Sequence, residues 1–128
     1  MKKTLITLFF ALLTVTIFAQ GKQITAKFKN EKTSFQQTTD GSVTKFDLVA
    51  TEQQISNLKA QASSIPDKMQ ISITKNTDKT YSCVLTVTHQ NHPEYVHKMF
   101  VYLGIESFII DGKEKKLDEL VNTLKTLK

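Results

Sequence analysis

Residues 43–55 read VTKFDLVATEQQI, and from Val43 onward the secondary-structure signals of the chain are clear. Phe46, Leu48 and Ala50 recur at every second position, which predicts a half-buried strand. Residues 51–54 then match a capping box, in which a threonine hydroxyl and a glutamine amide satisfy two unpaired backbone donors at a helix start. The first unit of the domain is therefore a strand that leads directly into a helix.

The spacing of the later apolar residues extends this unit to the order strand, helix, strand, strand, helix, strand, followed by one more helix. The expected elements are strands at 69–74, 81–89 and 107–110, a second helix at 93–103 and a terminal helix at 117–127. This order is that of the ferredoxin-like βαββαβ sandwich, with antiparallel strands and both crossover helices on one face. We therefore expect an α+β domain at residues 43–128, with an extra C-terminal helix. The other sheet face is expected to be solvated, bound to a partner or covered by the terminal helix.

The beginning of the chain has the composition of a secretory signal peptide. Lys2 and Lys3 form a basic start, an apolar stretch follows at residues 5–18, and Ala19 is a small residue at the expected cleavage point. The apolar stretch is shorter than the ~20 residues that span a bilayer. The alternatives are an N-terminal anchor or a buried helix. We expect residues 1–19 to be removed on export, leaving a soluble periplasmic or secreted protein without membrane insertion.

Residues 20–42 form a polar segment between the leader and the domain. Ile24, Ala26 and Phe28 alternate, which is typical of a short strand, and Asp40-Gly41 is a turn signal that would join a second short strand to the next one. A flexible lead-in is the other interpretation of this segment, and the sequence leaves both open.

The charge of the chain argues against nucleic acid as a partner. Its 17 basic residues are all lysine, and the formal net charge of +5 falls by two when Lys2 and Lys3 are removed with the leader. Specific recognition of phosphates and bases relies on the planar guanidinium of arginine, which lysine cannot reproduce. Because the lysines are also scattered along the sequence, a solvated basic surface is the expected structure.

The domain resembles the heavy-metal-associated family, small ferredoxin-like modules that carry copper or zinc. The resemblance covers about residues 43–111 and rests on the element order, on Val49-Ala50-Thr51 before the first helix and on residues 104–111 around the last strand. The family holds its metal with a Cys-x-x-Cys pair in the loop that enters the first helix. This chain has Thr51-Glu52-Gln53-Gln54 there instead. The resemblance therefore implies the fold and argues against the family's usual activity.

A divergent metal site remains an alternative. His89 and His92 lie at the expected end of a strand and start of a helix, where their imidazoles could converge on copper or zinc. Asp67, from a neighbouring turn, would be the third ligand. Surface and capping histidines are the other interpretation of the same residues.

Cys83 is the single cysteine of the chain and shares a predicted strand face with Leu85 and Val87. This position predicts a buried and unreactive thiol. A reactive thiol or an intermolecular disulfide is the alternative, but no basic neighbour in the sequence would lower the thiol pKa.

The sequence contains no recognisable catalytic motif. No Ser/His/Asp arrangement, phosphate-binding loop or nucleophile elbow is present, and many of the carboxylates lie at predicted turns or helix starts. We therefore expect no enzyme, no catalytic residue and no bound cofactor. The leading hypothesis is an exported, small, non-catalytic binding module that meets an unknown protein partner in the cell envelope through its open sheet face or its second helix. The alternative is the divergent copper or zinc protein.

Overall fold

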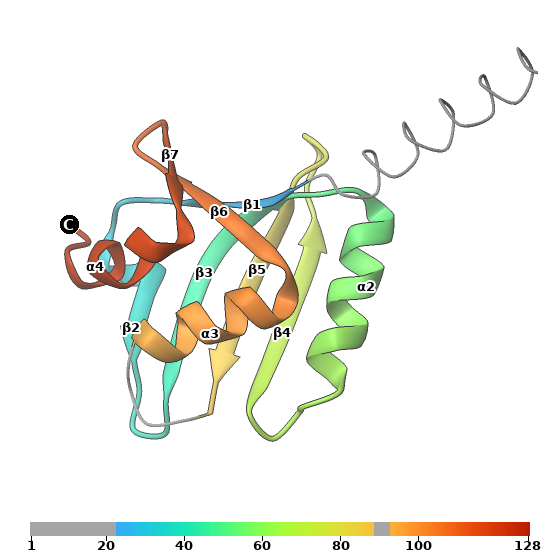
Figure 1. The fold of residues 1–128 in the computed structure, drawn as a ribbon, viewed down its shortest axis with the longest axis horizontal. Helices are drawn as coiled ribbons and strands as arrows, with labels where there is room; N and C mark the ends of the chain where they lie inside the picture. Colours follow the sequence, from blue (N-terminus) through green and yellow to red (C-terminus); the bar gives the residue numbers. More distant parts are fainter. Residues whose placement is uncertain (1–22, 89–92) are drawn as a thin grey trace, which may run out of the picture.

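A computed structural model describes residues 23–88 and 93–128 of the chain (Figure 1). The predicted leader at residues 1–19 lies outside the described residues. The described strands form one seven-stranded sheet with the order β4-β5-β3-β1-β6-β7, in which β2 also pairs with β3. The elements in chain order are β1 (Ile24–Phe28), the 3-10 turn η1 (Lys32–Ser34), β2 (Phe35–Gln37), β3 (Ser42–Val49), α2 (Glu52–Ser63), β4 (Met69–Lys75), β5 (Tyr81–Val87), α3 (Pro93–Leu103), β6 (Ile105–Ile110), β7 (Lys113–Lys116), the 3-10 turn η2 (Leu117–Glu119) and α4 (Leu120–Lys125).

The passage from β3 into α2 confirms the prediction made from residues 43–55. Phe46 and Leu48 are buried on β3. The Thr51 hydroxyl accepts a hydrogen bond from the backbone N–H of Gln54 at 3.1 Å, and the Gln54 side chain accepts one from the backbone N–H of Thr51 at 2.8 Å. Both halves of the capping box are therefore formed, and α2 begins at the next residue, Glu52.

The predicted ferredoxin-like βαββαβ sandwich is wrong, because the segment before it supplies a strand to the middle of the sheet. β1 pairs antiparallel with β3, where Ala26 lies opposite Leu48. On its other side β1 pairs parallel with β6, where Ala26 lies opposite Phe108. The sheet is therefore mixed rather than antiparallel, and β1 separates β3 from the strand that the expected fold would place beside it.

The physical reason is that β1 is apolar on one face and paired along both edges. Ile24, Ala26 and Phe28 are buried, while Thr25 is half-buried and Lys27 exposed on the opposite face. Two strand partners satisfy the backbone donors and acceptors of this short segment, which an extended lead-in would leave to water. The short strand considered for residues 24–28 is thus confirmed. Of the two interpretations that the sequence left open for the rest of this segment, the structure has the hairpin, in which β2 pairs antiparallel with β3.

The C-terminal part differs from the predicted continuous helix at 117–127. Residues 113–116 instead form β7, which pairs antiparallel with β6 after a turn at Asp111 and Gly112, both with positive φ. The helix itself is short, because η2 precedes it and α4 ends at Lys125. α4 packs against α3, and its Leu120 and Leu124 join the main core. The terminal helix therefore does not cover the opposite face of the sheet.

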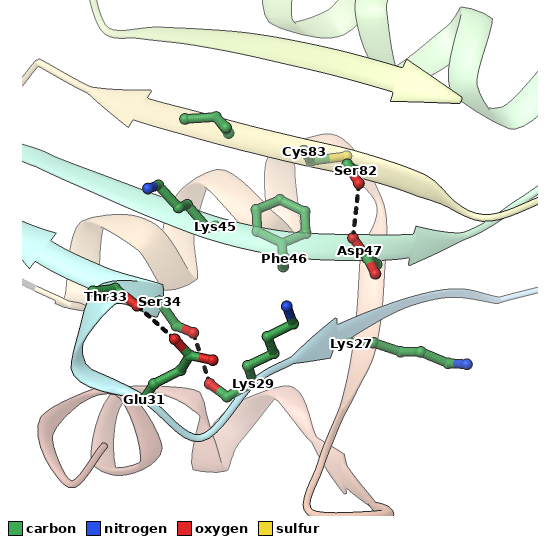
Figure 2. Close-up of a pocket in the computed structure, with 11 residues that line it drawn as sticks. Lys27, Lys29, Glu31, Thr33, Ser34, Lys45, Phe46, Asp47, Ser82 and Cys83 are labelled. Carbon is green, nitrogen blue, oxygen red and sulfur yellow. Dashed lines mark hydrogen bonds between the residues drawn. The ribbon is translucent and has the colours of Figure 1, made fainter. Parts of the chain in front are cut away.

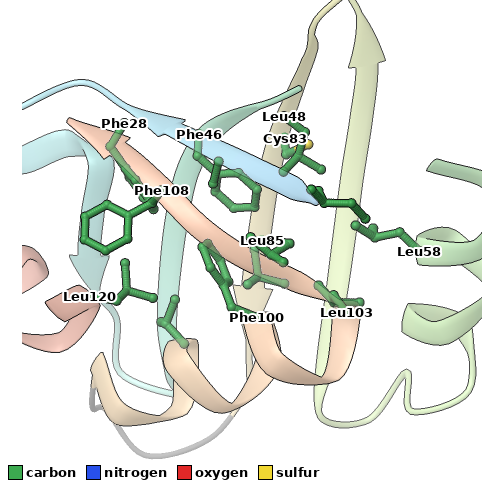
Figure 3. Close-up of a cluster of buried hydrophobic side chains, with 14 of the residues drawn as sticks. Phe28, Phe46, Leu48, Leu58, Cys83, Leu85, Phe100, Leu103, Phe108 and Leu120 are labelled. Carbon is green, nitrogen blue, oxygen red and sulfur yellow. The ribbon is translucent and has the colours of Figure 1, made fainter. Parts of the chain in front are cut away.

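The core lies between the sheet and the helices and is centred on four phenylalanine rings, one each from β1, β3, α3 and β6 (Figure 3). The ring of Phe28 lies 5.7 Å from Phe46, 6.0 Å from Phe100 and 5.9 Å from Phe108, measured between centroids. Aromatic pairs at these distances stabilise a core beyond the area that they bury. Through this cluster, β1 packs against β3, α3 and β6.

Candidate functional site

The described helices contribute to one core on a single side of the sheet. Apolar side chains of α2, α3 and α4 join the same buried cluster, together with every second residue of the strands (Figures 1 and 3). The alternate strand residues point to the other side, which we call the open face. Most of them are half-buried or exposed, among them Thr25, Lys27, Val43, Lys45, Asp47, Val49, Ser72, Thr74, Ser82, Val84 and Thr86.

The open face is hollowed where β1 and β2 meet the same edge of β3. Lys27 lies opposite Asp47, and Phe35 lies opposite Thr44. Between these two pairs, the segment from β1 to β2 runs through eight residues, whereas β3 covers three. The surplus residues turn away from the sheet through η1. Lys45 and Phe46 of β3 therefore have no partner in either register, and the sheet is locally open beside them.

We call the resulting cavity of about 370 Å³ the lysine hollow (Figure 2). Its lining comes from the end of β1, the η1 segment, the middle of β3 and the facing part of β5. The residues are Lys27, Lys29, Glu31, Thr33, Ser34, Lys45, Phe46, Asp47, Ser82, Cys83 and Val84. Figure 2 shows the amino group of Lys29 directed towards the Phe46–Asp47 part of β3.

Hydrogen bonds between neighbouring residues hold the rim of the lysine hollow. The buried Ser34 hydroxyl donates to the backbone carbonyl of Lys29 at 2.6 Å, which ties the two ends of the η1 segment together. Thr33 donates to the Glu31 carboxylate at 2.8 Å. On the sheet, the single proton of the Ser82 hydroxyl is shared between the Asp47 carboxylate at 3.2 Å and the side-chain oxygen of Asn76 at 2.9 Å. Both carboxylates of the hollow are thus engaged by hydroxyl groups of the protein.

The lysines of the hollow differ from its carboxylates in their interactions with the rest of the protein. Lys27, Lys29 and Lys45 are exposed, and none of them forms an ion pair with another residue of the described ranges 23–88 and 93–128. The residues that line the hollow include three lysines and two acidic residues, so the formal charge of the lining is positive. A ligand with an acidic group would gain favourable charge interactions there.

Cys83 lines the hollow, but its thiol belongs to the core. The side chain is 2% exposed, and Sγ donates to the backbone carbonyl of Tyr81 at 3.6 Å. Burial, aided by the negative charge of Asp47, raises the pKa of the Cys83 thiol to about 12. The prediction of a buried thiol is confirmed, and this group is protonated at neutral pH.

The predicted metal ligands do not coincide with this site. Asp67 is exposed in the turn between α2 and β4 and does not line the lysine hollow. His89 and His92 lie outside the described residues. Within the part of the chain that the structure describes, no three His, Cys, Asp or Glu side chains lie close enough together to hold a metal ion. The copper or zinc site therefore stays a prediction from the sequence.

Sequence reasoning missed the lysine hollow, because it treated the lysines as scattered. Lys27 and Lys29 are two residues apart, and Lys45 and Asp47 show the same spacing. That period places both residues of a pair on the same side of an extended segment, although Lys29 lies just beyond the end of β1. The sequence carries no signal that these two faces are adjacent, because their contact depends on the insertion of β1 beside β3.

Comparisons of this chain with family models, with curated proteins and with solved structures found no match. The resemblance to the heavy-metal-associated family accordingly stays a prediction from the quoted residues. Among the described residues, no helix has both the length and the apolar character needed to cross a membrane.

Proposed function

We propose that the protein is an exported, small, non-catalytic binding module that binds an anionic group of a protein partner in the cell envelope at the lysine hollow. The single observation that carries this proposal is the placement of Lys27, Lys29 and Lys45 around one cavity, on a sheet face that no described helix covers. The export part rests on the signal-peptide composition of residues 1–19.

The electrostatics of the hollow favour a reversible interaction. An ammonium group is a strongly hydrated point charge, so an exposed lysine binds a carboxylate or phosphate weakly, and the contact is screened by salt. Three lysines line the cavity, and two of them, Lys27 and Lys45, stand on paired strands. In Figure 2 the amino group of Lys29 points towards β3, whereas those of Lys27 and Lys45 point to opposite sides. The partner is therefore expected to dissociate readily as the salt concentration rises.

The chemistry of the lining supports binding rather than catalysis. The hollow contains no histidine, its Cys83 thiol is held protonated by burial, and both of its carboxylates accept hydrogen bonds from protein hydroxyls. Thr33 and Ser82 each donate to a carboxylate of the lining, but the hollow contains no histidine to act as the base of a serine or threonine nucleophile.

Affinity capture from a cell-envelope extract tests the proposal. The immobilised protein is compared with a triple variant, Lys27→Gln, Lys29→Gln and Lys45→Gln, which removes the charge and keeps a polar side chain only one atom shorter. A matched control carries Lys68→Gln, Lys79→Gln and Lys113→Gln, three exposed lysines that do not line the hollow.

We expect a partner that the unmodified protein and the control retain, that the hollow variant loses and that added salt elutes. Equal retention by all three proteins would refute the lysine hollow as the binding site. Loss from the control and the hollow variant alike would show that net charge alone, and not this cavity, holds the partner. A chemical-denaturation curve for each variant confirms that the fold is unchanged.

A further inference from the structure

β4 forms an edge of the sheet that is unusually well suited to accept another strand. All seven of its residues pair with β5 in one unbroken register, from Met69 opposite Val87 to Lys75 opposite Tyr81. Among residues 23–88 and 93–128, no strand lies on its outer side (Figure 1). The strand contains no proline and one charged residue, Lys75. A long, regular edge of this kind is a template for pairing with another chain.

The opposite edge of the sheet is protected against pairing with another chain. β7 has four residues, and all four are charged: Lys113, Glu114, Lys115 and Lys116. Short edge strands rich in lysine are a common means of preventing unwanted pairing. The chain therefore blocks one edge of its sheet, whereas the other is a long regular strand on which the backbone N–H of Met69 is bonded within the chain, to the carbonyl of Ile65.

The residues of β4 are complementary to a second copy of the same strand. Ser72 is the middle residue of the strand, so an antiparallel pair with full overlap has its two-fold axis there. In this register, Ile71 faces Ile73 of the second copy on the helix side, where both isoleucines are half-buried in the single chain. On the open face, the uncharged Gln70 faces Thr74 of the second copy.

The charges of α2, which lies along β4, are complementary about the same axis. Its twelve residues include two charged ones, Glu52 and Lys59, which are seven positions apart and share one face of the helix. Glu52 forms an ion pair with Lys75, at one end of β4, with 2.8 Å between Nζ and Oε1. Lys59 lines a cavity of about 320 Å³ beside Gln70 and Ile71, towards the other end. A two-fold axis at Ser72 therefore brings Glu52 of each copy towards Lys59 of the other.

We infer that the protein forms a symmetric homodimer by antiparallel pairing of the two β4 strands, with the two-fold axis at Ser72. The strand pattern and the helix charges are independent features, and both select the same axis. The interface lies at the outer edge of β4 and does not include the lysine hollow, so dimer formation and the proposed binding function can fail separately.

Disulfide trapping in the full-length protein tests the register directly. Cys83→Ala removes the native thiol, and Ser72→Cys or Thr74→Cys then adds one thiol on the exposed side of β4. Residues directly opposite in an antiparallel pair have Cα atoms about 4.5–5.5 Å apart, within the range that a disulfide bridges. We expect Ser72→Cys to form a covalent dimer under mild oxidation, whereas Thr74→Cys, which lies away from its symmetry mate, stays monomeric on the gel. Equal cross-linking of the two variants, or none in either, would overturn the proposed register.

A charge exchange measured by sedimentation equilibrium supplies the second test. Glu52→Lys or Lys59→Glu alone places like charges at both symmetry-related contacts, and we expect the dimer dissociation constant to rise roughly tenfold. The double variant, Glu52→Lys with Lys59→Glu, restores opposite charges across the axis and should bind more tightly than either single variant, although the ion pair between Glu52 and Lys75 within each chain stays broken. A protein that remains monomeric throughout, or a double variant no better than the singles, would refute the dimer proposed here.

Discussion

The strongest prediction about the fold concerns Phe28, because its ring attaches the N-terminal strand to the rest of the molecule. The side chain is 7% exposed, and its ring contacts the rings of Phe46, Phe100 and Phe108 at 5.7–6.0 Å. Phe28→Ala removes these contacts and leaves a cavity in the centre of the core, which typically costs about 3–5 kcal/mol. A domain of this size is stable by about 5–15 kcal/mol, so the loss should be large.

Urea denaturation followed by circular dichroism measures this effect as a lower midpoint with an unchanged slope. Phe28→Leu keeps much of the apolar volume and should lose clearly less, which keeps the test informative if the alanine variant fails to fold. Phe35→Ala is a matched control, because Phe35 lies in β2 and is only partly buried. A loss below about 1 kcal/mol for Phe28→Ala would show that residues 24–28 are a solvated lead-in and not a central strand.

Three further predictions concern the helix start, the thiol and the leader. Thr51→Ala removes the hydroxyl that caps α2 and should lower the free energy of unfolding by about 0.5–2 kcal/mol, whereas Thr51→Ser should be nearly neutral; two silent substitutions would mean that the capping box contributes nothing. Since burial raises the pKa of Cys83 from 9.0 to about 12, the unfolded chain loses this proton at lower pH than the folded protein. The free energy of unfolding, compared with that of a Cys83→Ala reference, is therefore unaffected by this thiol below pH 9. Between pH 9 and about 12 it falls by about 1.4 kcal/mol per pH unit, and parallel pH curves for the two proteins would disprove the effect. Intact-mass analysis of protein from the cell envelope should show loss of residues 1–19, and recovery of the unprocessed chain from the cytoplasm would contradict export.

The elements that sequence reasoning predicted correctly are those whose signals are local. The capping box at Thr51 needs only four adjacent residues, and the burial of Cys83 follows from alternation within one strand. The turn signal at Asp40-Gly41 is equally local, and β2 and β3 form the expected hairpin. These features are determined by residues close in the sequence, so their prediction does not require the topology.

The features that were missed depend on pairing between distant segments. The five residues of β1 are a weak strand signal, and nothing within them specifies that β3 and β6 lie on either side. β7 consists entirely of charged residues and forms because the turn at Asp111-Gly112 returns the chain to β6. The lysine hollow arises from the offset between the registers of β1 and β2 along β3, which no local pattern encodes.

The most direct test of the proposed function is a titration of the isotope-labelled protein with a short polyglutamate peptide, followed by backbone amide chemical shifts. We expect the shifts to concentrate at Lys27, Lys29, Lys45, Asp47 and Ser82, to weaken with added salt, and to vanish in the triple Lys→Gln variant of the hollow. Shifts spread over all the exposed lysines, or an unchanged titration of the triple variant, would contradict the assignment of the lysine hollow as the binding site.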